Sequence, residues 1–246
     1  MRFLIGVDDT DNPRTSSTGL IAQRLGLQMQ GAGLGKLEAI TRHQLLFSPQ
    51  VPCTTRNSAI CITFETDASR RSEIEMACRS FILREYCSGA DAGFALASWA
   101  QVTPEVYTWA RLAKTRVLAR EEALQAARSA KIAITGLTGS GNGIIGALAA
   151  IGLRYRGNDG RFLWIPNINQ LSGIYTYSEL MQIAPFERIE TLRGRAPRSD
   201  EKIDVGKWIR PVLRDGRCVL LVEEERENPD FAWHLLGMEE VRKLSD

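Results

Sequence analysis

The stretch "RFLIGVDDTDNPRTSSTG", residues 2–19, joins an apolar run to a group of carboxylates and then to a run of hydroxyls. Residues 2–7 are typical of a buried β-strand. Residues 18–30 carry apolar side chains at helical spacing, which predicts an amphipathic helix. Three carboxylates lie between the two elements: Asp8, Asp9 and Asp11. A strand that runs through an acidic turn into a helix indicates a fold built from both α and β elements.

Strand and helix patterns continue to alternate along the rest of the chain. Helices are expected at 69–86 and at 104–130, the second broken near Val117, and strands at 36–47, at the end of 51–66 and at 131–137. Two hairpins are predicted, at 153–166 with its turn at 158–160, and at 208–224. Residues 191–204 are polar and predict a loop or linker. Interleaved elements with hairpin signals predict an α+β fold with mixed sheets.

The composition is that of an ordinary globular protein. The 246 residues are 44% hydrophobic and 24% charged, with a net charge of +2. No apolar run approaches the roughly 18 residues of a membrane span, so we expect no membrane partner. The five cysteines form no CxxC pair. They predict reduced thiols in a cytoplasmic protein without a zinc ribbon.

The three carboxylates need a partner if they face one another, because like charges repel and raise one another's pKa. A hard cation such as Mg²⁺ takes oxygen ligands and leaves room for substrate phosphates. The alternative is a solvated turn, for which Asp11, Asn12 and Pro13 are suitable residues. The pair Asp9-x-Asp11 also resembles the nucleophile motif of haloacid-dehalogenase-type phosphatases. Pro13 stands where that motif has Thr or Val, which disfavours this interpretation.

Thr18 lies at the expected start of the first helix. Free backbone N–H groups and the positive end of the helix dipole attract anions there. Ser and Thr are also favoured at this place as N-caps, which satisfy the same N–H groups. The position therefore suits contact with a phosphate, a capping role, or both.

A second motif, "TGSGNGIIGALAAIG", lies at residues 138–152. Gly141, Gly143 and Gly146 match the dinucleotide fingerprint, but no acidic residue follows about 20 residues on, as that fingerprint requires. P-loop spacing is also present, but Asn142 and Gly143 replace its Lys and Ser/Thr. Backbone N–H groups free of Cβ obstruction at a helix N-terminus still suit phosphate. The alternative is a turn and a small-residue helix packed tightly on the sheet. The residues of the expected phosphate cradle are Gly139, Ser140, Gly141, Asn142 and Gly143.

Three segments together resemble one enzyme family. They are "GVDDTDNPR" at 6–14, "LLFSPQVPCTTRNSAICI" at 45–62 and "GSGNGIIGALAAIG" at 139–152. Their order and approximate spacing are similar to those of the archaeal-type 2-agmatinylcytidine synthetases, over about residues 1–165. That family modifies the wobble cytidine of an isoleucine tRNA with ATP and agmatine.

The resemblance implies a division of the chain into domains. A bipartite, kinase-like, ATP-binding catalytic domain would comprise residues 1–55 and 131–185. A ferredoxin-like domain would be inserted at 56–130, and a small β-rich module would cover 186–246. The family's zinc ribbon, which helps to hold tRNA, has no counterpart in the cysteines of this chain.

The resemblance also implies roles for single residues. The three N-terminal aspartates fall on the motif that handles Mg²⁺ and ATP, and Thr18 falls on a threonine that becomes autophosphorylated. The next segment of the family corresponds to Thr54, Thr55, Arg56 and Asn57, with Cys53 in the place of a tryptophan. Arg56 would neutralise charge on the transferred phosphoryl group. The glycine loop lacks the arginine that the family has there.

These observations favour an ATP- and Mg²⁺-dependent phosphotransferase or ligase. Its acceptor would be a tRNA cytidine or a small molecule such as an amine, and a homodimer stays open. The alternative is a nucleotide- or RNA-binding module without catalysis. At the C-terminal end, Trp208, Trp233 and three arginines (Arg193, Arg195, Arg198) could contact RNA, but acidic residues lie among them. This pattern favours a solvated face of mixed charge.

Overall fold

The computed structural model describes residues 1–12, 17–51, 53 and 56–246, and its central feature is a mixed sheet. The strands are β1 (Arg2–Asp8), β2 (Lys36–Gln44), β3 (Ser58–Glu65), β4 (Gly93–Ser98), β5 (Ala133–Gly136), β6 (Arg161–Trp164), β7 (Ile174–Thr176), β8 (Arg188–Glu190), β9 (Lys202–Asp204), β10 (Val212–Arg214), β11 (Arg217–Glu224) and β12 (Trp233–Leu235). The helices are α1 (Thr18–Gly31), α2 (Arg71–Glu85), α3 (Pro104–Leu112), α4 (Arg120–Ser129), α5 (Gly143–Arg156), α6 (Tyr177–Ile183) and α7 (Met238–Ser245). The expected α+β class with mixed strand directions is confirmed.

The first half of the sheet has the strand order β5-β4-β1-β3-β2. Neighbouring strands in it are antiparallel. The chain order β1-α1-β2-β3-α2-β4 with the sheet order β4-β1-β3-β2 is the ferredoxin-like arrangement. This arrangement therefore covers residues 2–98, beginning at the N-terminal strand.

Strand pairing continues across the expected boundary between residues 55 and 56. β3 and β4, which fall in the expected inserted domain, lie on either side of β1 and pair with it. Strand pairing also crosses the expected boundary between residues 185 and 186, because β7 lies before it and pairs with β9, which lies after it. We propose instead an N-terminal lobe that ends with β6 and a C-terminal lobe that begins with β7.

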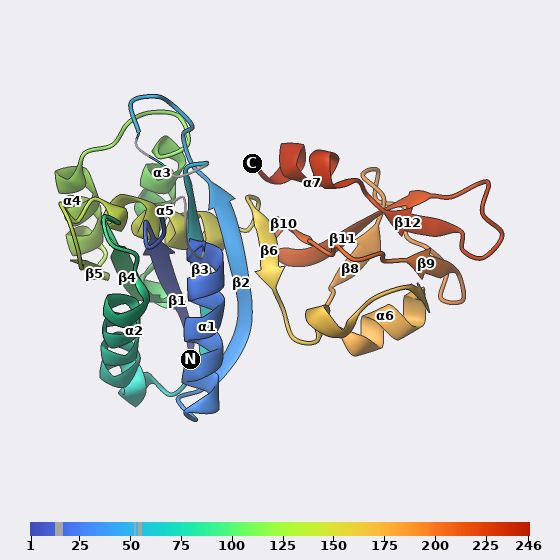
Figure 1. Cartoon of the computed structure of the whole chain (residues 1–246), viewed down its shortest axis with the longest axis horizontal. Coiled ribbons are helices and arrows are strands. Elements are labelled where there is room, and N and C mark those ends of the chain that lie inside the picture. The colour runs from blue at the N-terminus through green and yellow to red at the C-terminus, as the bar shows by residue number, and fades with distance from the viewer. Residues whose placement is uncertain (13–16, 52, 54–55) are drawn as a thin grey trace.

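Helices cover both faces of the first half of the sheet (Figure 1). α1 and α2 lie on one face, where Phe3, Ile5 and Val7 of β1 pack against α1 residues such as Ile21 and Leu25. α3, α4 and α5 lie on the other face. The side chains of β3 alternate between the two faces: Ile60, Ile62 and Phe64 belong to the α1 side and Cys61 to the α5 side.

α5 lies directly on the backbone of β1. A Cβ atom at Gly6 would be 1.8 Å from the carbonyl oxygen of Ala147. A Cβ at Gly93 of β4 would be 2.3 Å from the backbone nitrogen of Ile144. The small residues of the glycine motif thus serve tight helix–sheet packing, as one of the two sequence interpretations predicted. This close approach aims the N-terminus of α5 at the end of β1.

The hairpin predicted at 153–166 is wrong. α5 continues to Arg156 and ends at Gly157, which adopts a left-handed φ of 81°. The helix is stabilised over this last turn by buried Leu153 and Arg154, so the tertiary contacts decide between helix and strand. The turn signal at 158–160 instead connects the helix to β6, which pairs with β2 and β10.

The C-terminal lobe consists of β7 to β12 with α6 and α7 (Figure 1). The hairpin predicted at 208–224 is confirmed as β10 and β11, joined at Asp215 and Gly216. The polar segment 191–204 is loop except at its end, where β9 begins. α7 packs through Val241 on Val212 and Val219, and the chain ends beside the N-terminal lobe. No helix within the described residues is long and apolar enough to cross a membrane.

Candidate functional site

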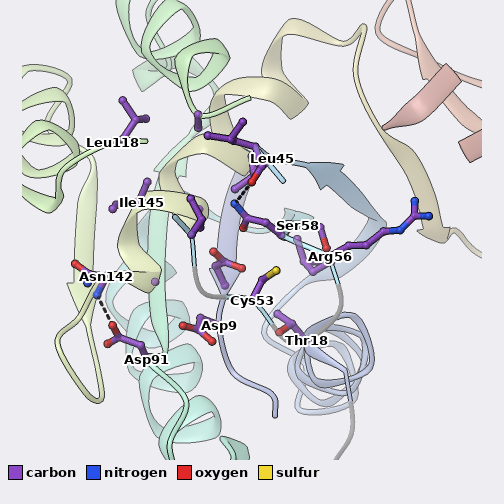
Figure 2. Close-up of a pocket in the computed structure, with 18 of the residues that line it drawn as sticks. Asp9, Thr18, Leu45, Cys53, Arg56, Ser58, Asp91, Leu118, Asn142 and Ile145 are labelled. Atoms are coloured by element: carbon purple, nitrogen blue, oxygen red, sulfur yellow. Dashed lines mark hydrogen bonds between the residues drawn. The ribbon is translucent and has the colours of Figure 1, made fainter. Parts of the chain in front are cut away.

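A pocket of about 1170 Å³ opens where β1 ends (Figure 2). Its wall is formed by the N-termini of α1, α4 and α5 and by the segment that follows β2. The sequence-predicted residues that line it are Asp8, Asp9, Asp11, Thr18, Arg56, Asn57, Asn142 and Gly143. Three motifs that are far apart in the sequence therefore meet at one pocket. Thr54 and Thr55 fall outside the described residues.

The carboxylates at the end of β1 are crowded against one another. Burial, together with the charges of Asp9 and Asp11, raises the pKa of Asp8 well above its usual range. Burial and the charges of Asp91 and Asp11 raise the pKa of Asp9. Asp9 also adopts a left-handed φ of 51°, a conformation that costs free energy in a non-glycine residue. Strain and repulsion at the same place are typical of a functional site.

Gly146 of α5 lets the Asp8 carboxylate lie against the helix. A Cβ atom at this position would be 1.8 Å from Oδ2 of Asp8. The first turn of α5 thus packs directly against an acidic group, where its free N–H groups and dipole favour a negative charge.

The hydroxyl of Thr18 connects two residues of the acidic turn. Its Oγ1 donates to Oδ1 of Asp11 at 3.0 Å and accepts from the hydroxyl and backbone nitrogen of Thr10 at 3.2 and 3.4 Å. Capping of α1 is performed by Ser17, whose side chain accepts from the backbone nitrogen of Leu20. The capping interpretation of Thr18 is therefore wrong. Thr18 opens the helix with its hydroxyl directed at a carboxylate.

The glycine loop holds an anion, and that anion is the side chain of Asp91. Oδ1 of Asp91 accepts from the backbone nitrogen of Gly141 at 2.5 Å, and Oδ2 accepts from that of Asn142 at 3.1 Å (Figure 2). The hydroxyl of Ser140 donates to the same carboxylate. Gly139, Ser140 and Gly141 do not line the pocket, whereas Asp91, to which Ser140 and Gly141 donate, does. Sequence reasoning missed Asp91, because one acidic residue before a strand forms no motif.

An arginine from another helix lies beside the glycine loop. Arg120, the first residue of α4, lines the pocket. A Cβ atom at Gly141 would be 3.4 Å from its Nε, which is buried and has no hydrogen-bond partner among the described residues. Burying an unpaired donor is costly, so this atom marks a place where an acceptor fits. Arg120 places a cation near the loop, where the sequence motif has none.

A basic group lies on the opposite wall of the pocket. Arg42 of β2, Arg56 and Arg161 of β6 each donate to the side chain of Asp246, at 2.7, 3.2 and 2.5 Å. The Arg56 side chain extends away from Asp9 in Figure 2. The predicted role of Arg56 at a transferred phosphoryl group therefore requires a different orientation of its side chain.

Mg²⁺ fits the chemistry of the acidic end. Among the described residues, no three His, Cys, Asp or Glu side chains are arranged to hold one metal ion. Mg²⁺ usually keeps several waters and takes one or two carboxylates together with substrate phosphates, so it does not need such a group. Burial raises the pKa values of Asp8 and Asp9, with the charges of neighbouring aspartates as a second cause, and a bound cation would favour the ionised form of both carboxylates.

Fold and pocket together define an α+β protein with an acidic, glycine-lined pocket at the end of its central strand. The crystal structure of TiaS in complex with an isoleucine tRNA and ATP is similar, with a TM-score of 0.54 and 26% identity over 62% of this chain and 36% of that one. Apo TiaS, described as an agmatidine synthetase of that tRNA, has a TM-score of 0.53 at 26% identity, over 62% of this chain and 35% of that one. The expected resemblance is thus confirmed at the level of the fold.

An uncharacterised protein of Methanocaldococcus jannaschii is 29% identical over 153 residues, which are 62% of this chain and 50% of that protein. No protein-family model matches the chain. The chain spans about half the length of this relative and about a third of the TiaS chains.

Proposed function

We propose that this protein is an ATP- and Mg²⁺-dependent phosphotransferase or ligase that activates an acceptor by phosphorylation. The observation that carries the proposal is the meeting of the acidic turn, Thr18 and the N-terminus of α5 at one pocket. The similarity of fold to TiaS, which is known in complex with tRNA and ATP, supports the same class of reaction. The acceptor is a tRNA cytidine or a small molecule.

The charges of the pocket suggest where the triphosphate would bind. Asp8 and Asp9 would hold Mg²⁺, which would shield the charge of the phosphates. Arg120 and the first turn of α5 would contact the phosphate oxygens, as positioning and electrostatic stabilisation require in phosphoryl transfer. Asp91 would turn away from the glycine loop if phosphate took its place at Gly141 and Asn142.

Thr18 is suited to accept a phosphoryl group. Its Oγ1 would attack the γ-phosphorus, the bond to the bridging oxygen would break, and ADP would leave. Asp11, which already accepts a hydrogen bond from this hydroxyl at 3.0 Å, would take the proton. Figure 2 shows Thr18 on the same side of the pocket as Asp9.

Replacement of Asp9 tests the proposal. Asp9→Asn removes the charge but keeps a residue that tolerates a left-handed φ, so the fold should be retained. We expect ATP turnover in the presence of Mg²⁺ to fall at least about 100-fold, as for loss of an electrostatic group in a transition state. The measurement is chromatographic separation of ATP, ADP and AMP, with circular dichroism to monitor the fold. Asp200→Asn, at an exposed site in the C-terminal lobe, is the matched control. Unchanged turnover in Asp9→Asn would refute the assignment.

The second candidate is a nucleotide- or RNA-binding module without catalysis. It is favoured by one observation, the occupation of the glycine-loop donors by Asp91. In this case calorimetry would detect nucleotide binding, while the chromatogram would show unchanged ATP for the wild-type protein.

A further inference from the structure

The basic wall of the pocket is a cluster of arginines around one carboxylate. We call Arg42, Arg56 and Arg161, which share the side chain of Asp246, the arginine cluster. The three guanidinium groups share this one side-chain carboxylate, and Lys114 donates to the backbone oxygen of Asp246 at 3.2 Å, so positive charge is in excess around the Asp246 side chain. All three arginines line the pocket whose other end is acidic.

Two members of the arginine cluster are held rigidly and are almost buried. The side chains of Arg42 and Arg161 are 12% and 8% exposed. Gln44 accepts from Arg42 at 2.7 Å, and the hydroxyl of Ser245 accepts from Arg161 at 2.8 Å. Burial and the neighbouring charge of Arg161 lower the pKa of Arg42. Two guanidinium groups that are almost buried and share one partner need an anion to compensate their charge.

The anion that the cluster contacts comes from the other lobe. Asp246 follows α7, which packs on β10 and β11 through Val241. The arginines belong to β2, to the segment before β3 and to β6. The carboxylate therefore reaches the pocket wall from an element that is separate from those carrying the cations.

We propose that the arginine cluster is a subsite for a phosphate group of the acceptor, and that Asp246 competes for it. A phosphate presents more acceptor oxygens than a carboxylate and more negative charge as a monoester, and the planar guanidinium binds it with two parallel hydrogen bonds. The acceptor then lies between the arginine cluster and the Mg²⁺ site at the acidic end of the pocket. The inference rests on the proposed function, because only that function makes the phosphate-bearing molecule an acceptor. Phosphate binding at the arginine cluster is measurable without ATP.

The test compares three probes by isothermal titration calorimetry in the absence of ATP. They are cytidine, cytidine 5′-monophosphate and the trinucleotide CpCpC. Asp246→Asn removes the competing charge and keeps the size of the side chain. We expect it to bind the two phosphate-bearing probes about five- to tenfold more tightly than the wild type, with no change for cytidine. Misfolding does not produce a gain of affinity restricted to phosphate.

Arg42→Gln gives the opposite change. Loss of a charge-assisted hydrogen bond should weaken the phosphate-bearing probes about tenfold or more. Glu239→Gln, on an exposed part of α7, removes one negative charge from the same helix without contacting the cluster, and it should leave all affinities unchanged. Tighter binding of CpCpC alone by Asp246→Asn would indicate that the cluster binds a phosphodiester of RNA. Tighter binding of the monophosphate would indicate a small phosphorylated acceptor.

Unchanged or weaker binding of both phosphate-bearing probes to Asp246→Asn would overturn the proposal and leave the cluster as a link between the lobes. Affinity for ATP with Mg²⁺ is measured on the same variants. Tighter ATP binding by Asp246→Asn would also overturn it, because the cluster would then belong to the ATP site. Failure of the proposed function appears separately, as absence of ATP turnover in the wild type.

Discussion

At the scale of single residues, close contact between Asp8 and Gly146 makes the site sensitive to one methyl group. Gly146→Ala would place a Cβ atom at the position that Oδ2 of Asp8 approaches, so the carboxylate must move. The side chain of Asp8 is short and half-buried, and we expect a loss of about 1–3 kcal/mol in the free energy of unfolding. ATP turnover should fall much further, because the carboxylate leaves its place.

The matched control for Gly146→Ala is Gly31→Ala at the end of α1, where a Cβ would meet no atom within 4 Å. This change should be neutral or slightly stabilising, by up to about 1 kcal/mol, since Ala favours the helix. Urea unfolding and ATP turnover measure the two effects. Full activity in Gly146→Ala would show that the position of Asp8 is unimportant.

Some residues of the candidate site could be predicted from the sequence and others could not. The aspartates 8, 9 and 11, with Thr18, could be predicted because they form one local motif beside a strand and a helix. Asp91 and Arg120 could not, because each reaches the site through the packing of an element that carries no motif. The partnership of Arg56 with Asp246 joins residues 190 positions apart and has no local signal.

At the scale of elements, β2 is joined to the turn before β6 by a buried histidine. His43 is fully buried, with Thr41 at 2.9 Å from Nε2 and Asp159 at 3.1 Å from Nδ1. Lys114 also donates to Asp159. His43 is therefore a core histidine of β2.

The buried histidine predicts a pH dependence of stability. Burial lowers the pKa of His43, so the folded state keeps it neutral, although Asp159 acts in the opposite direction and the charges of Arg154 and Lys114 favour the neutral form. Unfolded His43 takes up a proton below about pH 6.5. The free energy of unfolding should therefore fall as the pH decreases below about 6.5, by at most about 1.4 kcal/mol per pH unit for this group.

Urea unfolding between pH 5 and 7.5 measures this dependence. The second histidine, His234, is half-buried in the C-terminal lobe, and His234→Gln, which leaves His43 and its partners in place, is the matched control. His43→Gln should flatten the slope in the same window while lowering stability overall. An unchanged slope in His43→Gln would assign the pH dependence to other groups. The pKa of Asp159 is also lowered, so its contribution is lost only at more acidic pH, as the pH falls through its own folded value.

Helices and strands whose apolar residues recur at regular spacing could be predicted. Those whose type depends on tertiary contacts could not. α1, α2, β3 and the β10–β11 hairpin follow apolar spacing or turn residues that are visible in the chain. The end of α5 was predicted as a strand, because a short apolar run is compatible with either a helix or a strand. Its burial against the sheet, which the sequence does not show, makes it helical. The expected domain boundaries depended on the order of strands in the sheet, which local patterns do not contain.

At the scale of the whole molecule, one apolar core runs through both lobes. The same cluster of buried side chains includes Phe3 and Ile62 of the N-terminal lobe and Ile203 and Trp233 of the C-terminal lobe. β6 continues the sheet between them by pairing with β2 and β10. Shared burial of this kind predicts that the lobes unfold together.

Ile203→Ala tests this coupling from the distal end of the sheet. Ile203 is fully buried in β9, and its truncation should lower the free energy of unfolding by about 2–5 kcal/mol. Because the core is continuous, the whole transition should shift to lower temperature, both in far-ultraviolet circular dichroism and in ATP binding at the N-terminal lobe. Ile174→Ala on the neighbouring strand β7, where the side chain is 45% exposed, is the control and should change the midpoint little. A split into two transitions, with ATP binding lost at the wild-type temperature, would show that the lobes are independent and that Asp246 reaches the arginine cluster only as a surface contact.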